Sequence, residues 1–228
     1  MSKNQEEVTL TKKEVKEIRA GLQLQREVNE LEESRLNLKK LKLEAKGLRD
    51  TVTTRLATEG RNGVFRMYDV VTALTCHGLE VEILNYARRH PKGDITLMIR
   101  TPGGDIMAGL ALYDTLRTLS AQGHHITTIG RGMVASFGGI LLQAGDTRLL
   151  GKETQLMIHE LATYTGGKLH EMKDDVAFSK KLNKQLLRIM TRRTPELTAD
   201  ELYQKIKATD WWLPSKQAIR LGFADACG

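Results

Sequence analysis

Three residues far apart in the sequence could together perform nucleophilic catalysis. Ser136 stands in the segment GRGMVASFGGILLQAG, His159 follows the apolar run QLMI, and Asp210 precedes WWLP. A serine nucleophile needs a base that takes its proton and a third group that orients the base. The hydroxyl, imidazole and carboxylate of these residues are therefore candidates for nucleophile, general base and orienting group.

The same chemistry needs N–H donors for a developing oxyanion, and two segments could supply them. Ser136 is predicted at a strand-to-helix turn, so that the N–H of Phe137 would open the helix and point at the developing negative charge. Gly103 and Gly104 lie in the segment TPGG. Because glycine has no side chain, their backbone can approach a substrate closely and donate a second N–H.

Each of these residues also has a simpler interpretation. A serine among small residues is often a packing residue, and a histidine at a strand end is often a core or surface side chain. Asp210 could cap a helix, and PGG could be a turn alone. The order Ser, His, Asp differs from that of the nucleophile-elbow hydrolases, and the sequence has no G-x-S-x-G. Spacing alone therefore leaves the triad as one hypothesis among several.

Alternating strand and helix patterns from residue 64 onward predict the elements that would position these residues. The predicted strands are 94–101, 124–132 and 154–161. The predicted helices are 106–119, 168–193, 198–208 and 214–222, the third of them opened by a capping box of Thr198 and Glu201. Such alternation predicts an α/β fold with crossover connections.

The N-terminal part has a different pattern, without proline and dense in Lys, Glu, Arg, Leu and Gln. Residues 5–58 are predicted as a long amphipathic helix opened by a capping box of Thr11 and Glu14, with Gly21 and Gly47 as candidate breaks and 58–64 as a hinge. Its apolar stripe repeats at 3-4 spacing through Leu38, Leu41, Ala45, Leu48 and Val52. A lone helix of this kind is marginal in water, so it should pack on its own protein or on a partner. The predicted domains are a helical arm, 1–60, and a catalytic domain, 61–228.

Composition narrows the classes of protein. The 228 residues are 40% hydrophobic and 28% charged, with two cysteines and no apolar run long enough to span a membrane. No signal peptide is apparent, and Cys76 and Cys227 have no metal-ligand spacing, so a reducing cytoplasmic location is expected. The net charge is +7, but the lysines and arginines are interleaved with glutamates and form no motif with aromatic residues. This pattern disfavours a nucleic-acid partner.

Four motifs in order over residues 64–226 resemble the Clp-type proteolytic subunit (caseinolytic protease P) and its phage-borne relatives, within the crotonase-like superfamily. ITLMIRTPGGDIMAGLALYDTL resembles the family's strand, SPGG turn and helix, with Thr101 where serine is usual. TIGRGMVASFGGILLQAG and LMIHE resemble its nucleophile and base segments, and TDWWLPSKQAIRLGFAD resembles its closing segment.

The resemblance implies a crotonase-like α/β fold with a ββα superhelix core, to which this chain adds the helical arm. It implies a serine endopeptidase that needs no cofactor or metal, with Ser136, His159 and Asp210 as triad. The N–H groups of Gly104 and Phe137 would form the oxyanion hole. Peptide substrates would lie extended beside the segments after Gly104 and His159. It also implies a sevenfold homo-oligomeric ring, with a second stacked ring and an ATP-driven AAA+ unfoldase left open as further partners.

Three departures from the family pattern affect these implications. Glu160 and Leu161 follow His159 where a polar residue and proline are usual, so the substrate strand could differ there. Thr209 precedes Asp210 where an arginine commonly couples two rings. The arm replaces the short axial loops that meet an unfoldase, which leaves a phage head-maturation protease as an alternative.

Other arrangements are weaker alternatives. A serine–lysine dyad would need Lys152 or Lys168 near Ser136. Acyl-CoA chemistry, the other branch of the superfamily, uses oxyanion donors without a serine nucleophile. A metal site would have to combine histidines without recognisable spacing, namely His124, His125 and His170. An inactive scaffold with a coiled-coil arm is the alternative from a different class.

Overall fold

The computed structural model describes residues 12–59 and 62–228 and divides the chain into two compact units, Met1–Arg55 and Leu56–Gly228. The predicted capping residue Thr11 lies outside the described residues, as do residues 60–61 of the predicted hinge. No helix in the described ranges combines the length and the apolar character that a membrane crossing requires.

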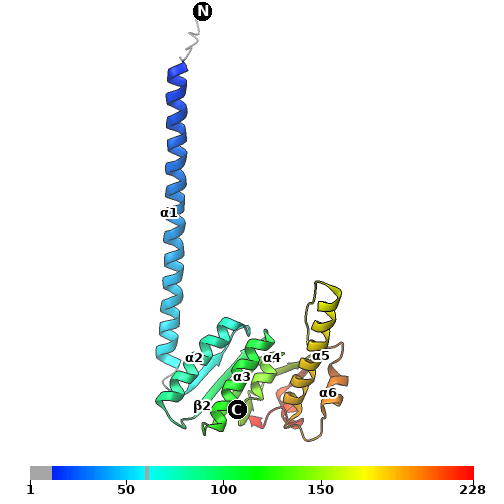
Figure 1. The fold of residues 1–228 in the computed structure, drawn as a ribbon. Helices are drawn as coiled ribbons and strands as arrows, with labels where there is room; N and C mark the ends of the chain where they lie inside the picture. The colour runs from blue at the N-terminus through cyan, green and yellow to red at the C-terminus, as the bar shows by residue number, and fades with distance from the viewer. Residues whose placement is uncertain (1–11, 60–61) are drawn as a thin grey trace, which may run out of the picture. The chain divides into compact units, whose positions relative to one another are not determined.

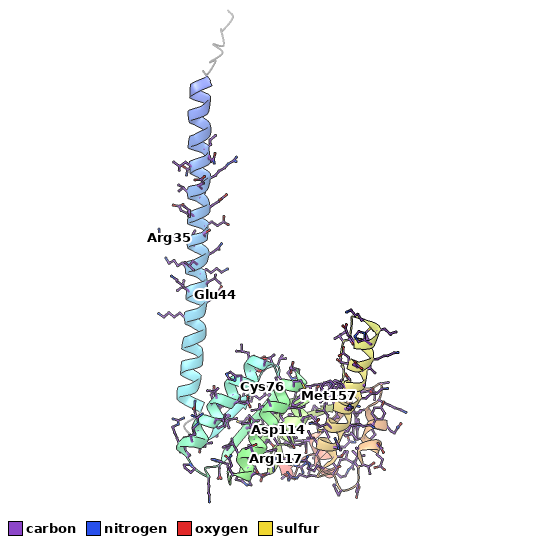
Figure 2. All side chains as sticks on the ribbon, in the orientation of Figure 1. Arg35, Glu44, Cys76, Asp114, Arg117 and Met157 are labelled. Carbon is purple, nitrogen blue, oxygen red and sulfur yellow. The ribbon has the colours of Figure 1, made fainter. Side chains whose placement is uncertain are left out.

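Helix α1 (Lys12–Glu59) accounts for the arm. It runs unbroken through Gly21 and Gly47, so the candidate breaks at these glycines are wrong. A helical glycine costs only about 1 kcal/mol relative to alanine, which the many strong helix formers around it outweigh. Side chains stand out around the helix (Figure 2), and large apolar ones are exposed, namely Leu22, Leu24, Val28, Leu31, Leu36, Leu38, Leu41 and Leu43.

The second unit is built on a seven-stranded sheet with the path β1-β2-β3-β4-β7, and β5 pairs with β3 and β6. All pairs are parallel except β5 with β6. The strands are β1 (Val64–Met67), β2 (Ile95–Thr101), β3 (Ile126–Ala135), β4 (Thr147–Leu150), β5 (Gln155–Ile158), β6 (Trp211–Pro214) and β7 (Ala226–Cys227). The predicted α/β class with crossover connections is confirmed.

Six helices accompany this sheet within the described residues. They are α2 (Ala73–Arg89), α3 (Ile106–Ala121), α4 (Phe137–Leu142), α5 (Leu169–Thr191), α6 (Ala199–Ile206) and α7 (Ser215–Arg220). The predicted capping box of Thr198 and Glu201 opens α6 and is confirmed. Helix α2 was not predicted from the sequence. It begins with a capping box of Thr72 and Thr75. Helices α2 and α3 pack together, and α5 packs on α6 (Figure 1).

Strand β3 is the longest strand and carries the chain into the site. Its first half, Ile126–Gly130, pairs with β2 and β4, and its second half, Met133–Ala135, pairs with β5. Gly132, with φ +66°, lies between the halves. On one side β2 stays beside β3 as far as the pair Thr101–Val134, while on the other β5 replaces β4 and is brought beside the end of β3.

The core lies between this sheet and its helices. Its largest fully buried side chains are Phe65, Met67, Ile83, Ile95, Leu97, Ile99, Leu112, Leu116, Ile126, Leu141, Leu142 and Phe223. Burial of such side chains stabilises a fold by about 1.5–3 kcal/mol each. Leu141 and Leu142 belong to α4, so the short helix that follows Ser136 is fixed by the core.

A polar cluster ties the C-terminal segment to α4. The buried Arg148 donates hydrogen bonds to Asp225 at 2.6 Å and to Gln143 Oε1 at 2.6 Å, and Gln143 donates to the carbonyl of Phe223. Arg193 also contacts the Asp225 carboxylate at 3.1 Å. Partial burial raises the pKa of Asp225, but the hydrogen bonds from Arg148 and the charges of both arginines outweigh it and hold the pKa below its usual value.

Candidate active site

Ser136 occupies a strained turn between β3 and α4, as the sequence predicted. Its φ is +53° and its ψ −120°, a conformation that non-glycine residues rarely adopt and that costs on the order of 1–3 kcal/mol. Its N–H donates to the carbonyl of Met157 on β5 at 2.9 Å. Its side chain makes no capping bond to α4, so the hydroxyl is available for another partner.

That partner is His159. Its Nε2 lies 2.7 Å from Ser136 Oγ, within hydrogen-bond distance. His159 is the first residue after β5, one residue beyond the end of the strand that pairs with β3 next to Ser136. The parallel β3–β5 pair therefore brings two residues 23 positions apart into direct contact.

Asp210 is brought near by the antiparallel pair β5–β6. Ile158 is paired with Trp211, so continuing the register by one residue places His159 opposite Asp210. Both residues line a cavity of about 490 Å³. The Asp210 side chain is exposed, and no hydrogen bond joins it to the His159 ring among the described contacts. The structure thus brings Ser136 and His159 into contact and leaves Asp210 beside them.

The turn after β2 packs directly against Ser136. Thr101 Oγ1 donates to the carbonyl of Asp69 at 2.6 Å and accepts from the N–H of Gly103 at 3.1 Å. Of the two glycines predicted to supply a second N–H, Gly103 already donates its N–H to the Thr101 hydroxyl. Gly104 forms a β-bridge with Val71: the Val71 N–H donates to the Gly103 carbonyl, and the Asp105 N–H donates to the Val71 carbonyl. The Gly104 N–H takes no part in this bridge.

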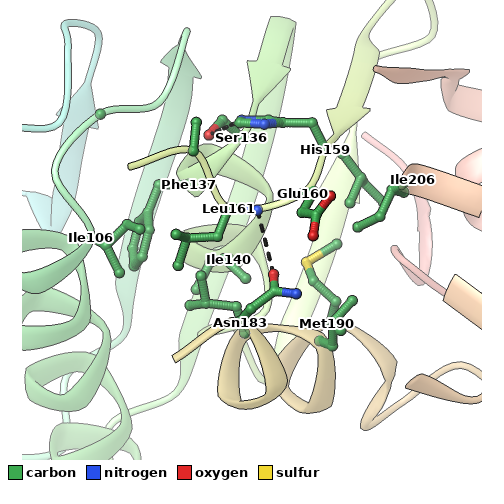
Figure 3. Close-up of a pocket in the computed structure, with 15 residues that line it drawn as sticks. Ile106, Ser136, Phe137, Ile140, His159, Glu160, Leu161, Asn183, Met190 and Ile206 are labelled. Carbon is green, nitrogen blue, oxygen red and sulfur yellow. Dashed lines mark hydrogen bonds between the residues drawn. The ribbon is translucent and has the colours of Figure 1, made fainter. Parts of the chain in front are cut away.

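A cavity of about 210 Å³ opens beside the Ser136–His159 pair (Figure 3). Most of its lining is apolar, and it comes from α3, α4, the segment after β5, α5 and α6. The lining residues are Gly104, Ile106, Ser136, Phe137, Ile140, Ile158, His159, Glu160, Leu161, Ala162, Asn183, Leu186, Leu187, Met190 and Ile206. The cavity is therefore placed to receive a side chain next to a group attacked by Ser136.

Two residues that line or border the cavity, Asn183 and Tyr203, were not predicted from the sequence as part of the site. Asn183 Oδ1 accepts from the N–H of Leu161 at 3.4 Å (Figure 3), and Tyr203 donates to Glu160 Oε1 at 3.2 Å. The charge of Glu160, followed by this hydrogen bond, raises the pKa of Tyr203. The sequence offered one signal for these contacts, the presence of Glu160 and Leu161 where the family has a polar residue and proline. Sequence spacing cannot show which side chains of α5 and α6 contact these two residues.

The structure does not support the serine–lysine dyad or the histidine metal site. Neither Lys152 nor Lys168 lines the cavity beside Ser136. His124 bonds to the carbonyl of Gly93, and His125 bonds to Thr147. In the described ranges, no group of three or more His, Cys, Asp and Glu side chains is placed to hold a metal ion.

The buried Cys76 is a poor nucleophile in this environment. Burial, with the nearby charges of Glu80 and Asp105, raises the pKa of its thiol to about 11, and a thiol needs its thiolate form to attack.

The structure thus presents a serine on a strained strand-to-helix turn within hydrogen-bond distance of an imidazole, an arrangement in which the imidazole could take the serine proton. The family model for Clp protease matches residues 61–228 of this chain. The chain belongs to the Clp protease family, whose members have the crotonase-like α/β fold.

Similar proteins carry the same family name. The chain is 31% identical over 152 residues to the ATP-dependent Clp protease proteolytic subunit 2 of Bifidobacterium longum, covering 63% of this chain and 68% of that protein. It is 30% identical over 183 residues to subunit 1 of Corynebacterium jeikeium, covering 78% and 91% of the two chains. It is 31% identical over 137 residues to subunit 2 of Tropheryma whipplei, covering 59% and 73%.

Proposed function

We propose that this member of the Clp protease family is a serine endopeptidase with Ser136 as nucleophile and His159 as general base. Ser136 Oγ attacks the carbonyl carbon of the scissile peptide bond while its proton passes to His159 Nε2. The same imidazolium then gives the proton to the leaving amine, and water hydrolyses the acyl-enzyme by the reverse roles. The 2.7 Å contact between Nε2 and Oγ carries this proposal.

The oxyanion of the tetrahedral intermediate would be bound by the N–H groups of Phe137 and Gly104. Phe137 is the first residue of α4, so its N–H has no acceptor within the helix. Gly104 shares the cavity wall with Ser136, and its N–H takes no part in the bridge to Val71. Gly103 would contribute through its missing side chain, which lets this turn lie against Ser136. Donors held in place before the reaction stabilise developing charge more effectively than water does.

Asp210 is the proposed orienting group for His159. Its support is the β5–β6 register, which sets the two residues opposite each other, and the cavity that both line. Hydrogen bonds in catalytic sites are often long without substrate and tighten in the complex. The proposed closed state has the Asp210 carboxylate accepting from Nδ1–H of His159.

Substrates would be protein segments in extended conformation, pairing as added strands beside the segments after Gly104 and His159. The relatives are proteolytic subunits of ATP-dependent proteases by name, which supports a homo-oligomeric ring, proposed as sevenfold, and an AAA+ unfoldase as candidate partner. The proposed organisation joins an arm, 1–60, to a protease domain, 61–228, in the cytoplasm. A phage head-maturation protease would use the same site on other substrates.

Turnover of small fluorogenic peptides by the wild type and by Ser136→Ala tests the proposal. We expect the variant to lose activity by a factor of roughly 10⁴ or more, with unchanged assembly by sedimentation. Equal turnover by both proteins would contradict the nucleophile assignment. An absence of turnover by both, with intact assembly, would favour the inactive scaffold.

A further inference from the structure

Glu160 adds a carboxylate to the mostly apolar lining of the cavity beside the nucleophile. It is the only acidic residue among the 15 that line the cavity, and His159 is the only other ionisable one. In Figure 3 the Glu160 side chain lies below His159, between Leu161 and Ile206. A negative charge is therefore built into the wall of the space next to Ser136.

Tyr203 holds this carboxylate from outside the cavity. The phenol on α6 donates to Oε1 at 3.2 Å, and the charge of Glu160 contributes to the raised pKa of Tyr203. Oε2 has no protein hydrogen-bond donor among the described contacts, and the residue is half-buried. One oxygen is thus anchored, which limits the side chain's freedom, and the other is available to a ligand.

Glu160 forms no ion pair with the lysines that share a groove with it. Lys180 and Lys184 line the adjoining groove with Glu160, as does Asp200. Neither lysine lies within ion-pair distance of the Glu160 carboxylate in the part of the chain that the structure describes. A cation that entered the cavity would therefore find a carboxylate that forms no ion pair with a lysine or arginine of residues 12–59 and 62–228.

We propose that Glu160 is a specificity-determining residue that favours substrates with lysine or arginine on the acyl side of the scissile bond. The inference rests on the proposed function, because Ser136 must attack the carbonyl of that residue. The cavity adjoins Ser136, Phe137 and Gly104, so the side chain next to the attacked carbonyl is the one that enters it. Lysine and arginine combine an apolar stem with a cationic tip, which fits apolar walls that carry one carboxylate.

The alternatives at this position are less favourable. An aliphatic side chain would fill the cavity but displace water from Oε2 of Glu160 without supplying a donor, and a charged oxygen buried without a hydrogen bond is costly. An acidic side chain would add like-charge repulsion. The Glu160 carboxylate therefore favours a cationic side chain at this substrate position and disfavours aliphatic and acidic ones.

Three fluorogenic peptides that differ only in the acyl-side residue, as arginine, norleucine or glutamate, test this inference. For the wild type we expect kcat/KM for the arginine peptide to exceed that for norleucine by roughly 10- to 100-fold, the range of a charge-assisted hydrogen bond. Glu160→Gln should reduce this ratio to about 1, and Glu160→Lys should favour the glutamate peptide over the arginine peptide. Glu153→Gln removes the same charge from an exposed residue that lines none of these cavities, and should keep the wild-type ratio.

The comparison within the wild type needs no variant, so a folding defect cannot obscure it. A norleucine peptide cleaved as fast as the arginine peptide, or a preference that survives in Glu160→Gln, would overturn the role of Glu160 and leave the proposed protease intact. Failure of the wild type to cleave any of the three peptides would contradict the proposed function, and the inference with it.

Discussion

A Cβ atom added to Gly103 would lie 2.5 Å from Cβ of Ser136 and 2.9 Å from its Oγ. The turn after β2 therefore fits against the serine turn with no room for any side chain. The backbone of Gly103 also has a φ of +99°, which other residues rarely adopt. The missing side chain of this glycine therefore permits the close approach of the two turns.

Gly103→Ala should consequently impair catalysis far more than it impairs folding. The new methyl group must push Ser136 away from His159, and small displacements of reacting groups cost about 100-fold in rate. We expect kcat/KM for peptides to fall by roughly 100-fold or more. Gly123→Ala is the matched control, because Gly123 has the same φ of +99° but its added Cβ would meet only the Lys92 side chain, at 3.4 Å. A similar loss of activity in both variants would show that backbone strain alone is responsible.

Asp210→Asn tests whether the residue opposite His159 orients it. An amide at this position can stabilise the wrong imidazole tautomer and cannot stabilise the imidazolium, so kcat should fall by roughly 10³- to 10⁴-fold. Steady-state kinetics with a small peptide measure the change, and thermal unfolding should show little difference because the side chain is exposed. A loss of kcat below tenfold would mean that Asp210 does not orient His159.

Much of the site's framework could be predicted from local sequence. A hydroxyl residue flanked by small residues and glycines predicts a tight strand-to-helix turn, and Ser136 lies in one. The capping box at Thr198 and the apolar run before His159 are local signals too, and both elements are present, although β5 ends at Ile158, three residues before the predicted end. These features depend on neighbours within a few positions, so sequence pattern reports them.

The remainder depends on pairing between distant segments. Nothing in WWLP shows that β6 would pair antiparallel with β5, the pairing that sets Asp210 opposite His159. The hydrogen bond from the Thr101 hydroxyl to the carbonyl of Asp69 and the contact of Tyr203 with Glu160 are likewise tertiary. Gly21 and Gly47 were predicted as helix breaks from a local signal, but α1 is continuous through both because the surrounding residues are strong helix formers.

The cluster around Asp225 predicts an acid-sensitive fold. The pKa of Asp225 is held below its usual value, so its contribution to stability is complete above the unfolded value of about 4 and is lost as pH falls through the lower folded value. Asp225→Asn would also leave the buried Arg148 without its charge partner, which costs about 3–5 kcal/mol near neutral pH. Urea unfolding at pH 7 and at pH 3 should show a large difference from the wild type at the first pH and a smaller one at the second.

Asp114→Asn is the control for this measurement. Asp114 is exposed on α3 and has no ion pair among the described contacts, so its free energy of unfolding should stay within about 0.5 kcal/mol of the wild type. A difference between wild type and Asp225→Asn that did not shrink in acid would contradict the assignment of Asp225 as the titrating group.

The exposed leucines of α1 predict a role for the arm in assembly. Leu38 is 53% and Leu41 61% exposed on a helix that is marginal without a partner. We propose that arms of neighbouring subunits pack together and support the ring or restrict its entrance. Deletion of residues 1–58 should leave a core that still cleaves small peptides, with a weaker oligomer by sedimentation or faster degradation of casein. An oligomer and casein rate equal to those of the full chain would instead indicate that the arm binds a separate partner.

Labelling with a serine-reactive phosphonate, followed by peptide mapping, tests the central assignment most directly. An activated serine reacts with such a reagent, whereas a serine that only packs does not. We expect one modified peptide, carrying the phosphonate on Ser136, with labelling abolished by Ser136→Ala and slowed by His159→Ala. Modification of a different serine, or labelling at Ser136 that is unaffected by His159→Ala, would contradict the Ser136–His159 site.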